Sequence, residues 1–286
     1  MNKQIVSKPI CEIVDKYIDS FQKSNGKGRF VVLQVGDDKG STKYIELKKK
    51  AGDKYGVNIE HIRLDSSVGE DKLIKVVEDL NQDHNVRGIM IQSPISGMDI
   101  DLVANKISPA KDFDGMSNDA AVLPAVVVSM LHYLEYILLS QSLSEFENLL
   151  FAENYFEMRD ELFHNFLTGK RICIINDSII LGKPMAKYFS TLGLKVDVCN
   201  KYTKDISVYT KNADILVTAT GVHNLIKGNM IKPGVVILDA GYPGGDIEVS
   251  SVESICNFFT PVPGGVGPLT VSCLFENIVR LGKMKG

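Results

Sequence analysis

A tyrosine and a lysine in the first part of the chain have the chemistry and spacing of an acid/base pair. Tyr44 and Lys48 lie four residues apart in a segment with helical periodicity, so the phenol and the amine project from one face about one turn apart. A lysine that is partly desolvated has a lowered pKa and can exchange protons with water or a ring nitrogen. The spacing alone is common by chance, and an aromatic edge beside a solvated lysine is its ordinary interpretation.

Two further polar groups follow along the chain. The run Gln92-Ser93-Pro94 comes directly after an apolar segment, and parallel α/β sheets bind ligands where their strands end. Asp112 and Asp114 flank a phenylalanine, so their carboxylates would share one face of an extended chain. Asp114 could accept two hydrogen bonds from an amidine-like ring edge. The simpler interpretation is a turn with a solvated acidic pair.

A candidate nucleotide loop lies in the second half of the chain. The run NDSIILGKP at 176–184 separates an apolar segment from a helical one, so its backbone N–H groups and the helix N-terminus would receive a pyrophosphate. It holds a single glycine, and is therefore no GxGxxG motif. Small residues also end two apolar segments, at 218–221 and 239–241, where backbone could approach a cofactor closely.

The elements that must position these residues follow an alternating pattern. Strands are expected at 29–36, 57–64 and 86–94, with helices at 41–56 and 69–83, which makes a βαβαβ unit with parallel strands. The second half repeats the alternation with near-continuous apolar strands at 170–177, 195–200, 214–221 and 235–241 and helices from 184 and 206, typical of a doubly wound sheet covered on both faces.

Two segments connect or close these halves. Residues 126–168 are rich in leucine and aromatics, and we expect two helices with a break near 140–144, where SLSE offers a capping box. The Gly/Pro-rich run TPVPGGVGPLTVS at 260–272 is expected to be a loop of fixed shape, and 276–286 an amphipathic final helix.

Composition narrows the classes of function. A net charge of -3 and a pI near 6.0 give no support for nucleic-acid binding. Five scattered cysteines without a CxxC pair fit reduced thiols in a cytoplasm, none of them catalytic and none in a metal site. The N-terminus has no apolar signal segment and no stretch approaches the length of a membrane span, so a secreted or membrane protein is not expected.

Together the motifs resemble those of the methylenetetrahydrofolate dehydrogenase/cyclohydrolases, in the same order and over nearly the whole chain. The matching motifs are SxxYxxxK at 41–48, QSP at 92–94, KDFDG at 111–115, SxxxGKP at 178–184 and TPVPGGVGP at 260–268. The resemblance implies a two-domain α/β protein: an N-terminal three-layer folate domain (1–122 plus 266–286) and a Rossmann-like NAD(P)-binding domain (123–265), with a cleft between them. It also implies a homodimer.

The resemblance assigns roles by position. Lys48 would be the cyclohydrolase acid/base, with Tyr44 beside it, Gln92 tuning it and Asp114 holding the pterin. The remaining folate-binding residues would be Ser93, Pro94, Pro263, Gly264 and Gly267. The cofactor-binding residues would be Asn176, Asp177, Ser178, Gly182, Lys183, Pro184, Lys201, Thr220, Gly221, Asp239, Gly241 and Tyr242. Hydride transfer needs alignment more than a proton shuttle, so one cleft could serve both steps.

The chain departs from the family pattern in several places. Asn176 stands where a glycine is usual, and asparagine tolerates left-handed dihedrals better than most residues. Leu123-Pro124-Ala125-Val126 replaces a Thr-Pro-x-Gly run, and Met116-Ser117-Asn118 replaces another family run after the aspartate. A helical insertion around 137–168 has no role that the sequence explains. Asp177 suits a free ribose hydroxyl, whereas Lys201 suits a 2'-phosphate; NADP is favoured, with NAD possible.

Two other kinds of protein share part of this pattern. A short-chain dehydrogenase also uses Tyr-x-x-x-Lys, but its glycine-rich loop precedes that pair, so the order of motifs rejects it. The stronger competitor is a paralogue whose cofactor loop has decayed, leaving a folate-binding or regulatory protein, or a cyclohydrolase alone. Its motivation is Asn176, Asp177 and Leu123. The residues that count against it are the intact Tyr44, Lys48, Gln92 and Asp114.

Overall fold

The chain divides into two compact units, which we describe separately. The computed structural model describes residues 3–25, 28–95 and 97–284. The five-stranded unit comprises Met1–Val14 and Val126–Thr270, and the three-stranded unit comprises Asp15–Ala125 and Val271–Gly286. The N-terminal segment groups with the five-stranded unit because Gln4 forms a β-bridge with Phe259 and the Ser7 amide donates to the Gly264 carbonyl.

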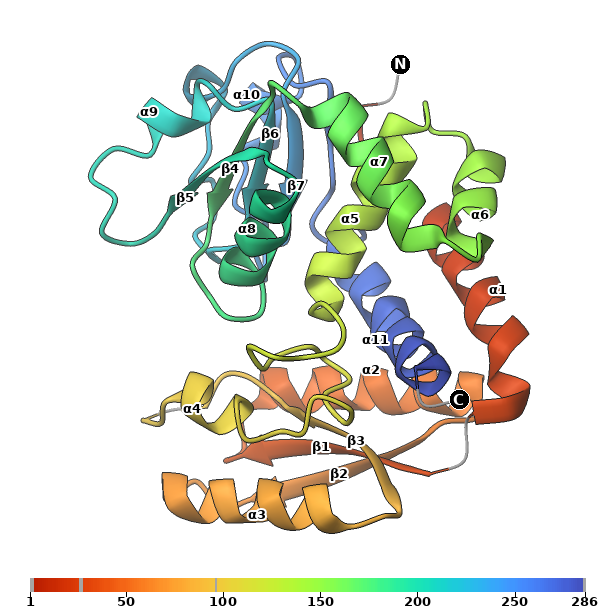
Figure 1. Cartoon of the computed structure of the whole chain (residues 1–286). Coiled ribbons are helices and arrows are strands. Elements are labelled where there is room, and N and C mark those ends of the chain that lie inside the picture. The colour runs from red at the N-terminus through yellow and green to blue at the C-terminus, as the bar shows by residue number, and fades with distance from the viewer. Residues whose placement is uncertain (1–2, 26–27, 96, 285–286) are drawn as a thin grey trace. The chain divides into compact units, whose positions relative to one another are not determined.

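The three-stranded unit has the predicted parallel βαβαβ topology. Its strands β1 (Arg29–Val35), β2 (Asn58–Leu64) and β3 (Val86–Ile91) are ordered β2-β1-β3. The crossover helices α2 (Lys39–Tyr55) and α3 (Glu70–Gln82) lie on opposite faces of this sheet (Figure 1). The polar residues expected at strand ends therefore gather at the carboxyl edge of a sheet that is covered on both faces.

Local signals fix the ends of α2, the helix that carries Tyr44 and Lys48. The Asp38 carboxylate accepts from the Ser41 amide at 2.6 Å, which satisfies one of the free donors of the first turn. Gly56 ends the helix in the left-handed conformation at φ 67°, where a residue with Cβ would be strained. Short α4 (Ile100–Ala104) and parts of α1 (Lys8–Asn25) complete this unit.

The five-stranded unit holds an all-parallel sheet. Strands β4 (Arg171–Ile175), β5 (Lys195–Cys199), β6 (Ile215–Thr218), β7 (Val236–Asp239) and β8 (Phe258–Phe259) are ordered β5-β4-β6-β7-β8. The predicted doubly wound pattern is confirmed, and β8 is an added edge strand. The short elements that connect the strands are α8 (Gly182–Thr191), α9 (Ser207–Thr210), η1 (Gly228–Met230) and α10 (Val249–Val252).

The segment between the two sheets forms three helices instead of two. They are α5 (Ala125–Leu138), α6 (Leu143–Phe151) and α7 (Tyr155–Leu167). The predicted break near Ser140 exists, and the Ser142 hydroxyl caps α6 by accepting from the Glu145 amide at 3.3 Å. A second break at 152–154 was missed, because no glycine or proline marks it.

Buried polar contacts join these helices to the rest of the five-stranded unit. Glu135 on α5 is fully buried and accepts from the Tyr155 hydroxyl on α7 at 2.7 Å. Arg159 on α7 lies over the ring of Tyr188 on α8, with 4.7 Å between its guanidinium carbon and the ring centroid. The Tyr188 hydroxyl in turn donates to Asp160 at 2.5 Å. The insertion is thus packed against the helix that follows the candidate nucleotide loop.

The C-terminal helix begins earlier than the sequence predicts. Helix α11 spans Val266–Lys283, so 266–272, which we expected to belong to a loop, is helical. Pro268 lies in its first turn, where its missing N–H breaks no helical hydrogen bond. The end of the predicted helix at 285–286 lies outside the described residues. Among the residues that the structure describes, no helix is both long enough and apolar enough to cross a membrane.

Candidate functional site

Lys48 lies at the carboxyl edge of the three-stranded sheet. Its Nζ donates to Gln92 Oε1 at 2.8 Å and lies 3.6 Å from the sulfur of Met90. Gln92 follows β3 and is itself held because its Nε2 donates to the Ser93 carbonyl at 2.8 Å. The predicted association of Lys48 with Gln92 is therefore present, and the amide oxygen fixes the amine in one position.

Burial shifts the pKa values of Lys48 and Asp114 toward neutral pH. Desolvation lowers the pKa of Lys48, and the negative charge of Asp114 opposes that shift. Desolvation raises the pKa of Asp114 to about 6, against the opposing effect of the Lys48 charge. Two groups whose environments disfavour their charged forms are suited to exchange protons near neutral pH.

The two aspartates of the KDFDG run have different environments. Asp112 is fully buried and accepts from the amides of Met116 at 3.1 Å and Ser117 at 2.7 Å, so it holds the loop together. Asp114 is only half-buried and interacts electrostatically with Lys48. The expectation that both carboxylates share one face therefore overlooked the turn at Gly115, which has φ 67°.

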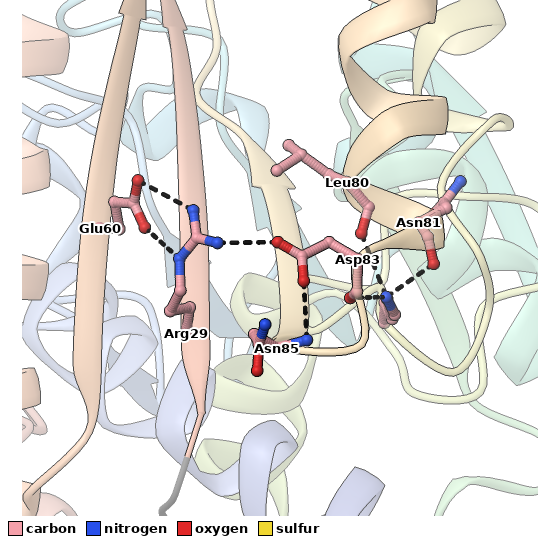
Figure 2. A network of polar contacts seen from close by, with 7 residues as sticks. Arg29, Glu60, Leu80, Asn81, Asp83 and Asn85 are labelled. Atoms are coloured by element: carbon pink, nitrogen blue, oxygen red, sulfur yellow. Dashed lines mark hydrogen bonds and ion pairs between the residues drawn. The ribbon is translucent and has the colours of Figure 1, made fainter.

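Lys111 anchors the start of the same loop. Its Nζ donates to the carbonyls of Leu80, Asn81 and Asp83 at 3.1, 2.7 and 2.9 Å. These three acceptors, labelled in Figure 2, lie at the carboxyl end of α3. These carbonyls carry the negative end of the helix dipole, which favours a bound cation. Lys111 therefore belongs to the support of the Asp114 loop.

The other predicted folate-side residues of this unit lie near Gln92 or Lys48 along the chain. The Ser93 carbonyl accepts from the Ser41 hydroxyl at 3.3 Å as well as from Gln92, and the Ser93–Pro94 peptide bond is cis. Tyr44 is half-buried one turn before Lys48 on α2. The first helical turn of α2 and the end of β3 are thus tied together at this edge.

In the five-stranded unit, Asn176 follows β4 and closes the candidate nucleotide loop. Its Oδ1 accepts from the Ser178 amide at 2.9 Å, the Ser178 hydroxyl at 2.6 Å and the Gly182 amide at 3.2 Å. Its backbone is not left-handed: within the described part of the chain, non-glycine residues with positive φ are Ser140, Gln141 and Asn224. Asn176 therefore replaces a glycine by bonding the loop with its amide, and the expected left-handed turn is wrong.

Gly182, the one glycine of this loop, has a steric role. A Cβ at Gly182 would lie 1.8 Å from the Asn176 carbonyl oxygen, so only glycine permits α8 to start this close to the end of β4. Lys183 and Pro184 follow in the first turn of α8.

A pocket of about 610 Å³ lies beside this loop in the five-stranded unit. Four of the predicted cofactor residues line it, namely Asn176, Asp177, Lys201 and Thr220. The pocket is also lined by Asn200, Thr203, Lys204 and Asp205, which no sequence motif indicated. These residues form the turn after β5, where the sequence predicts only Lys201.

The charges at the mouth of this pocket are mixed. The Asp177 carboxylate accepts from the Asn200 amide nitrogen at 3.0 Å, so it lies across the end of β5. Lys201 and Lys204 line the same pocket and are exposed. Two carboxylates, Asp177 and Asp205, and two ammonium groups therefore line the pocket that a ligand would enter.

Asp239 and Gly241 shape a loop around a residue that the sequence analysis missed, Asp246. Burial raises the pKa of Asp239 to about 6; its carboxylate accepts from the amides of Gly241 at 2.8 Å and Asp246 at 2.8 Å. A Cβ at Gly241 would lie 2.0 Å from Asp246 Oδ1, so this glycine makes room for a carboxylate of the protein itself. Asp246 also accepts from the Thr220 amide at 2.7 Å. Its position in a turn-rich run gave no sequence signal.

Gly221 and Tyr242 meet at the same end of the sheet. Gly221 has φ 73°, and a Cβ there would lie 2.9 Å from the Tyr242 carbonyl oxygen. Tyr242 is 56% exposed and precedes a cis proline. In the closing loop, Pro263 follows a third cis bond, Gly264 has φ 97°, and Gly267 is exposed in the first turn of α11.

Comparisons with known proteins decide the family. Residues 1–114 match the family model for the tetrahydrofolate dehydrogenase/cyclohydrolase catalytic domain, and 159–285 match that for its NAD(P)-binding domain. The bifunctional protein FolD of Caldanaerobacter subterraneus subsp. tengcongensis is 34% identical, over 97% of this chain and 94% of that protein. The chain belongs to the tetrahydrofolate dehydrogenase/cyclohydrolase family.

Other family members agree in sequence and in structure. The bifunctional protein FolD of Mycoplasma mycoides is 31% identical over 99% of this chain and 96% of that protein. The crystal structure of the bifunctional FolD methylenetetrahydrofolate dehydrogenase/cyclohydrolase from Campylobacter jejuni has a TM-score of 0.79 at 29% identity, and covers 98% of each chain. The two-domain α/β architecture, with parallel sheets and an NAD(P)-binding domain, is thus a property of the family that this chain shares.

Proposed function

We propose that this chain oxidises 5,10-methylenetetrahydrofolate to 5,10-methenyltetrahydrofolate with NAD(P), and then hydrolyses the product to 10-formyltetrahydrofolate in one-carbon metabolism. The observation that carries the proposal is the arrangement of Lys48, Gln92 and Asp114 at one sheet edge, in a chain of this family. The substrates are small tetrahydrofolate derivatives, and neither nucleic acid nor a membrane is a partner.

Lys48 performs the proton transfers of the hydrolytic step. Because desolvation lowers its pKa, the amine can accept a proton from the water that attacks the methenyl carbon, and return it when the ring opens. Gln92 orients the amine through the 2.8 Å hydrogen bond. Asp114 binds the pterin edge, while Tyr44, Ser93, Pro94, Pro263, Gly264 and Gly267 complete the folate-binding set.

The five-stranded unit supplies the dinucleotide site. A dinucleotide held there would supply a nicotinamide as the hydride acceptor for the oxidation of the methylene carbon. Asn176, Asp177, Lys201 and Thr220 line the pocket on which this assignment rests. The further residues of the proposed set are Ser178, Gly182, Lys183, Pro184, Gly221, Asp239, Gly241 and Tyr242. NADP is the preferred cofactor because Lys201 and Lys204 can pair with its 2'-phosphate, and NAD is the alternative that Asp177 favours.

A cyclohydrolase without dehydrogenase activity is the second candidate. The hydrogen bonds of Asn176 favour it, since they occupy loop donors that a pyrophosphate would use. The arrangement around Lys48 is the same under both candidates, so only cofactor chemistry separates them.

The remaining parts of the proposal follow from the resemblance. The folate domain comprises 1–122 with 266–286, and the nucleotide domain comprises 123–265 with its insertion at 137–168. The enzyme acts in the cytoplasm as a homodimer. Light scattering that gives the mass of a single chain would contradict the dimer.

Wild-type turnover tests the proposal. Purified protein is mixed with methylenetetrahydrofolate and either NADP or NAD, and both the reduced nucleotide and 10-formyltetrahydrofolate are measured. We expect both products, with a higher kcat/KM for NADP. Hydrolysis of added methenyltetrahydrofolate without any nucleotide reduction would leave the cyclohydrolase alone, and a clear preference for NAD would overturn the choice of NADP.

A further inference from the structure

The side chain of Asn176 brings together three donors of the nucleotide loop. Its Oδ1 accepts from the amide and the hydroxyl of Ser178 and from the Gly182 amide, at 2.6 to 3.2 Å. Its Nδ2 donates to the Ala219 carbonyl at 2.8 Å, at the end of the neighbouring strand β6. The partners of Oδ1 and of Nδ2 together fix the orientation of the amide. In the flipped orientation, the NH2 group would face the three donors of Ser178 and Gly182 and could not accept from them.

These bonds use donors that a pyrophosphate would need. A backbone amide and a hydroxyl each carry one hydrogen, so neither can donate fully to two acceptors. At the start of α8, the Gly182 amide donates to Asn176, the Lys183 amide to the Ser178 carbonyl at 3.0 Å, and the Met185 amide to the Leu181 carbonyl at 3.0 Å. Pro184 has no N–H. The N–H donors at the start of this helix therefore already have acceptors within the chain, although such donors at helix N-termini commonly bind phosphate.

We propose that Asn176 is an affinity-determining residue whose amide oxygen competes with the cofactor pyrophosphate for the donors of Ser178 and Gly182. The inference rests on the proposed function only in taking this loop as the dinucleotide site. A phosphate oxygen is the stronger acceptor because it is charged, so it displaces the amide. Each binding event must first break the hydrogen bonds of Asn176. The free energy of these bonds is lost from the binding free energy, so the cofactor binds more weakly.

The competition predicts that removing the amide strengthens binding. Asn176→Ala and Asn176→Gly are titrated with NADP and with NAD by calorimetry, beside the wild type. We expect the Kd of the preferred nucleotide to fall about five- to tenfold, the effect of one typical net hydrogen bond. Alanine suits the backbone here because Asn176 is not left-handed. Circular dichroism and the unfolding midpoint show that each variant is folded.

Asn212→Ala is the matched control. The Asn212 amide also donates to a backbone carbonyl, that of Val208 at 2.8 Å, but it is exposed and lies outside the pocket lining. Its loss should leave the Kd unchanged.

The opposite sign would overturn the inference. If Asn176 instead holds the loop in its binding shape, both folded variants bind the nucleotide more weakly than the wild type does. An unchanged Kd in both variants would contradict the inference as well. Failure of all three proteins to bind would also overturn it. Tighter binding by the variants supports it even where wild-type turnover fails, so this test and the turnover test can fail separately.

Discussion

At the scale of single residues, the same desolvation that suits Lys48 and Asp114 to proton transfer also costs stability. Burial raises the pKa of Asp114 from 3.8 to about 6, so between these pH values the folded chain holds a proton that the unfolded chain has released. Stability therefore falls as pH rises through this window. The loss of stability caused by the charged Asp114 is fully present above about pH 6 and absent below about pH 4.

Replacing Asp114 should exchange activity for stability. Asp114→Asn removes the cost of the charged form, so the free energy of unfolding at neutral pH should rise by up to about 3 kcal/mol, and the gain should shrink as pH falls from 6 to 4. Urea unfolding across this pH range measures the gain in the free energy of unfolding. The rate of methenyl hydrolysis by the variant should fall. Asp119→Asn is the control, since Asp119 is exposed. A gain that does not change with pH would show that desolvation is not the cause.

Among single residues, the placement of Lys48 beside Gln92 was predictable from the sequence. Gln92 comes directly after an apolar strand, and parallel strands place their carboxyl ends together. The interior carboxylate of Asp246 was missed, as were Asn200 and Lys204 of the pocket. Long-range contacts place Asp246, and the turn after β5 places Asn200 and Lys204; neither periodicity nor motif spacing indicates these positions.

At the scale of elements, the parallel strands and crossover helices were predictable because their hydrophobic periods are strong. The ends of helices were not: α11 starts within a Gly/Pro-rich run, and an unmarked break separates α6 from α7. Pro268 is compatible with the first turn of a helix, and no glycine or proline marks the break after α6. The insertion, which sequence left without a role, packs through Arg159 against Tyr188 on α8.

The carboxyl end of α3 should hold the Asp114 loop through Lys111. Lys111→Met leaves three backbone carbonyls without their charged donor, so we expect a loss of about 1 to 3 kcal/mol in the free energy of unfolding. Amide hydrogen exchange of Asp112 to Ser117 should also accelerate. Lys106→Met, at an exposed site before the same loop, is the control. Unchanged exchange in Lys111→Met would mean that the contacts of Asp112 hold the loop without Lys111.

At the scale of the whole molecule, the residues proposed for the two chemical steps belong to different compact units. Lys48, Gln92 and Asp114 belong to the three-stranded unit, and the dinucleotide pocket belongs to the five-stranded unit. A substitution in the first unit should therefore stop hydrolysis without removing the cofactor site. This separability is the central claim of the proposed function.

Lys48→Met tests that claim most directly. The variant is given methylenetetrahydrofolate and NADP, with Lys50→Met, an exposed lysine of the same helix, as its control. We predict that Lys48→Met still reduces NADP at much of the wild-type rate and accumulates methenyltetrahydrofolate, while the control forms 10-formyltetrahydrofolate as the wild type does. Formation of 10-formyltetrahydrofolate by folded Lys48→Met at the wild-type rate would contradict the account.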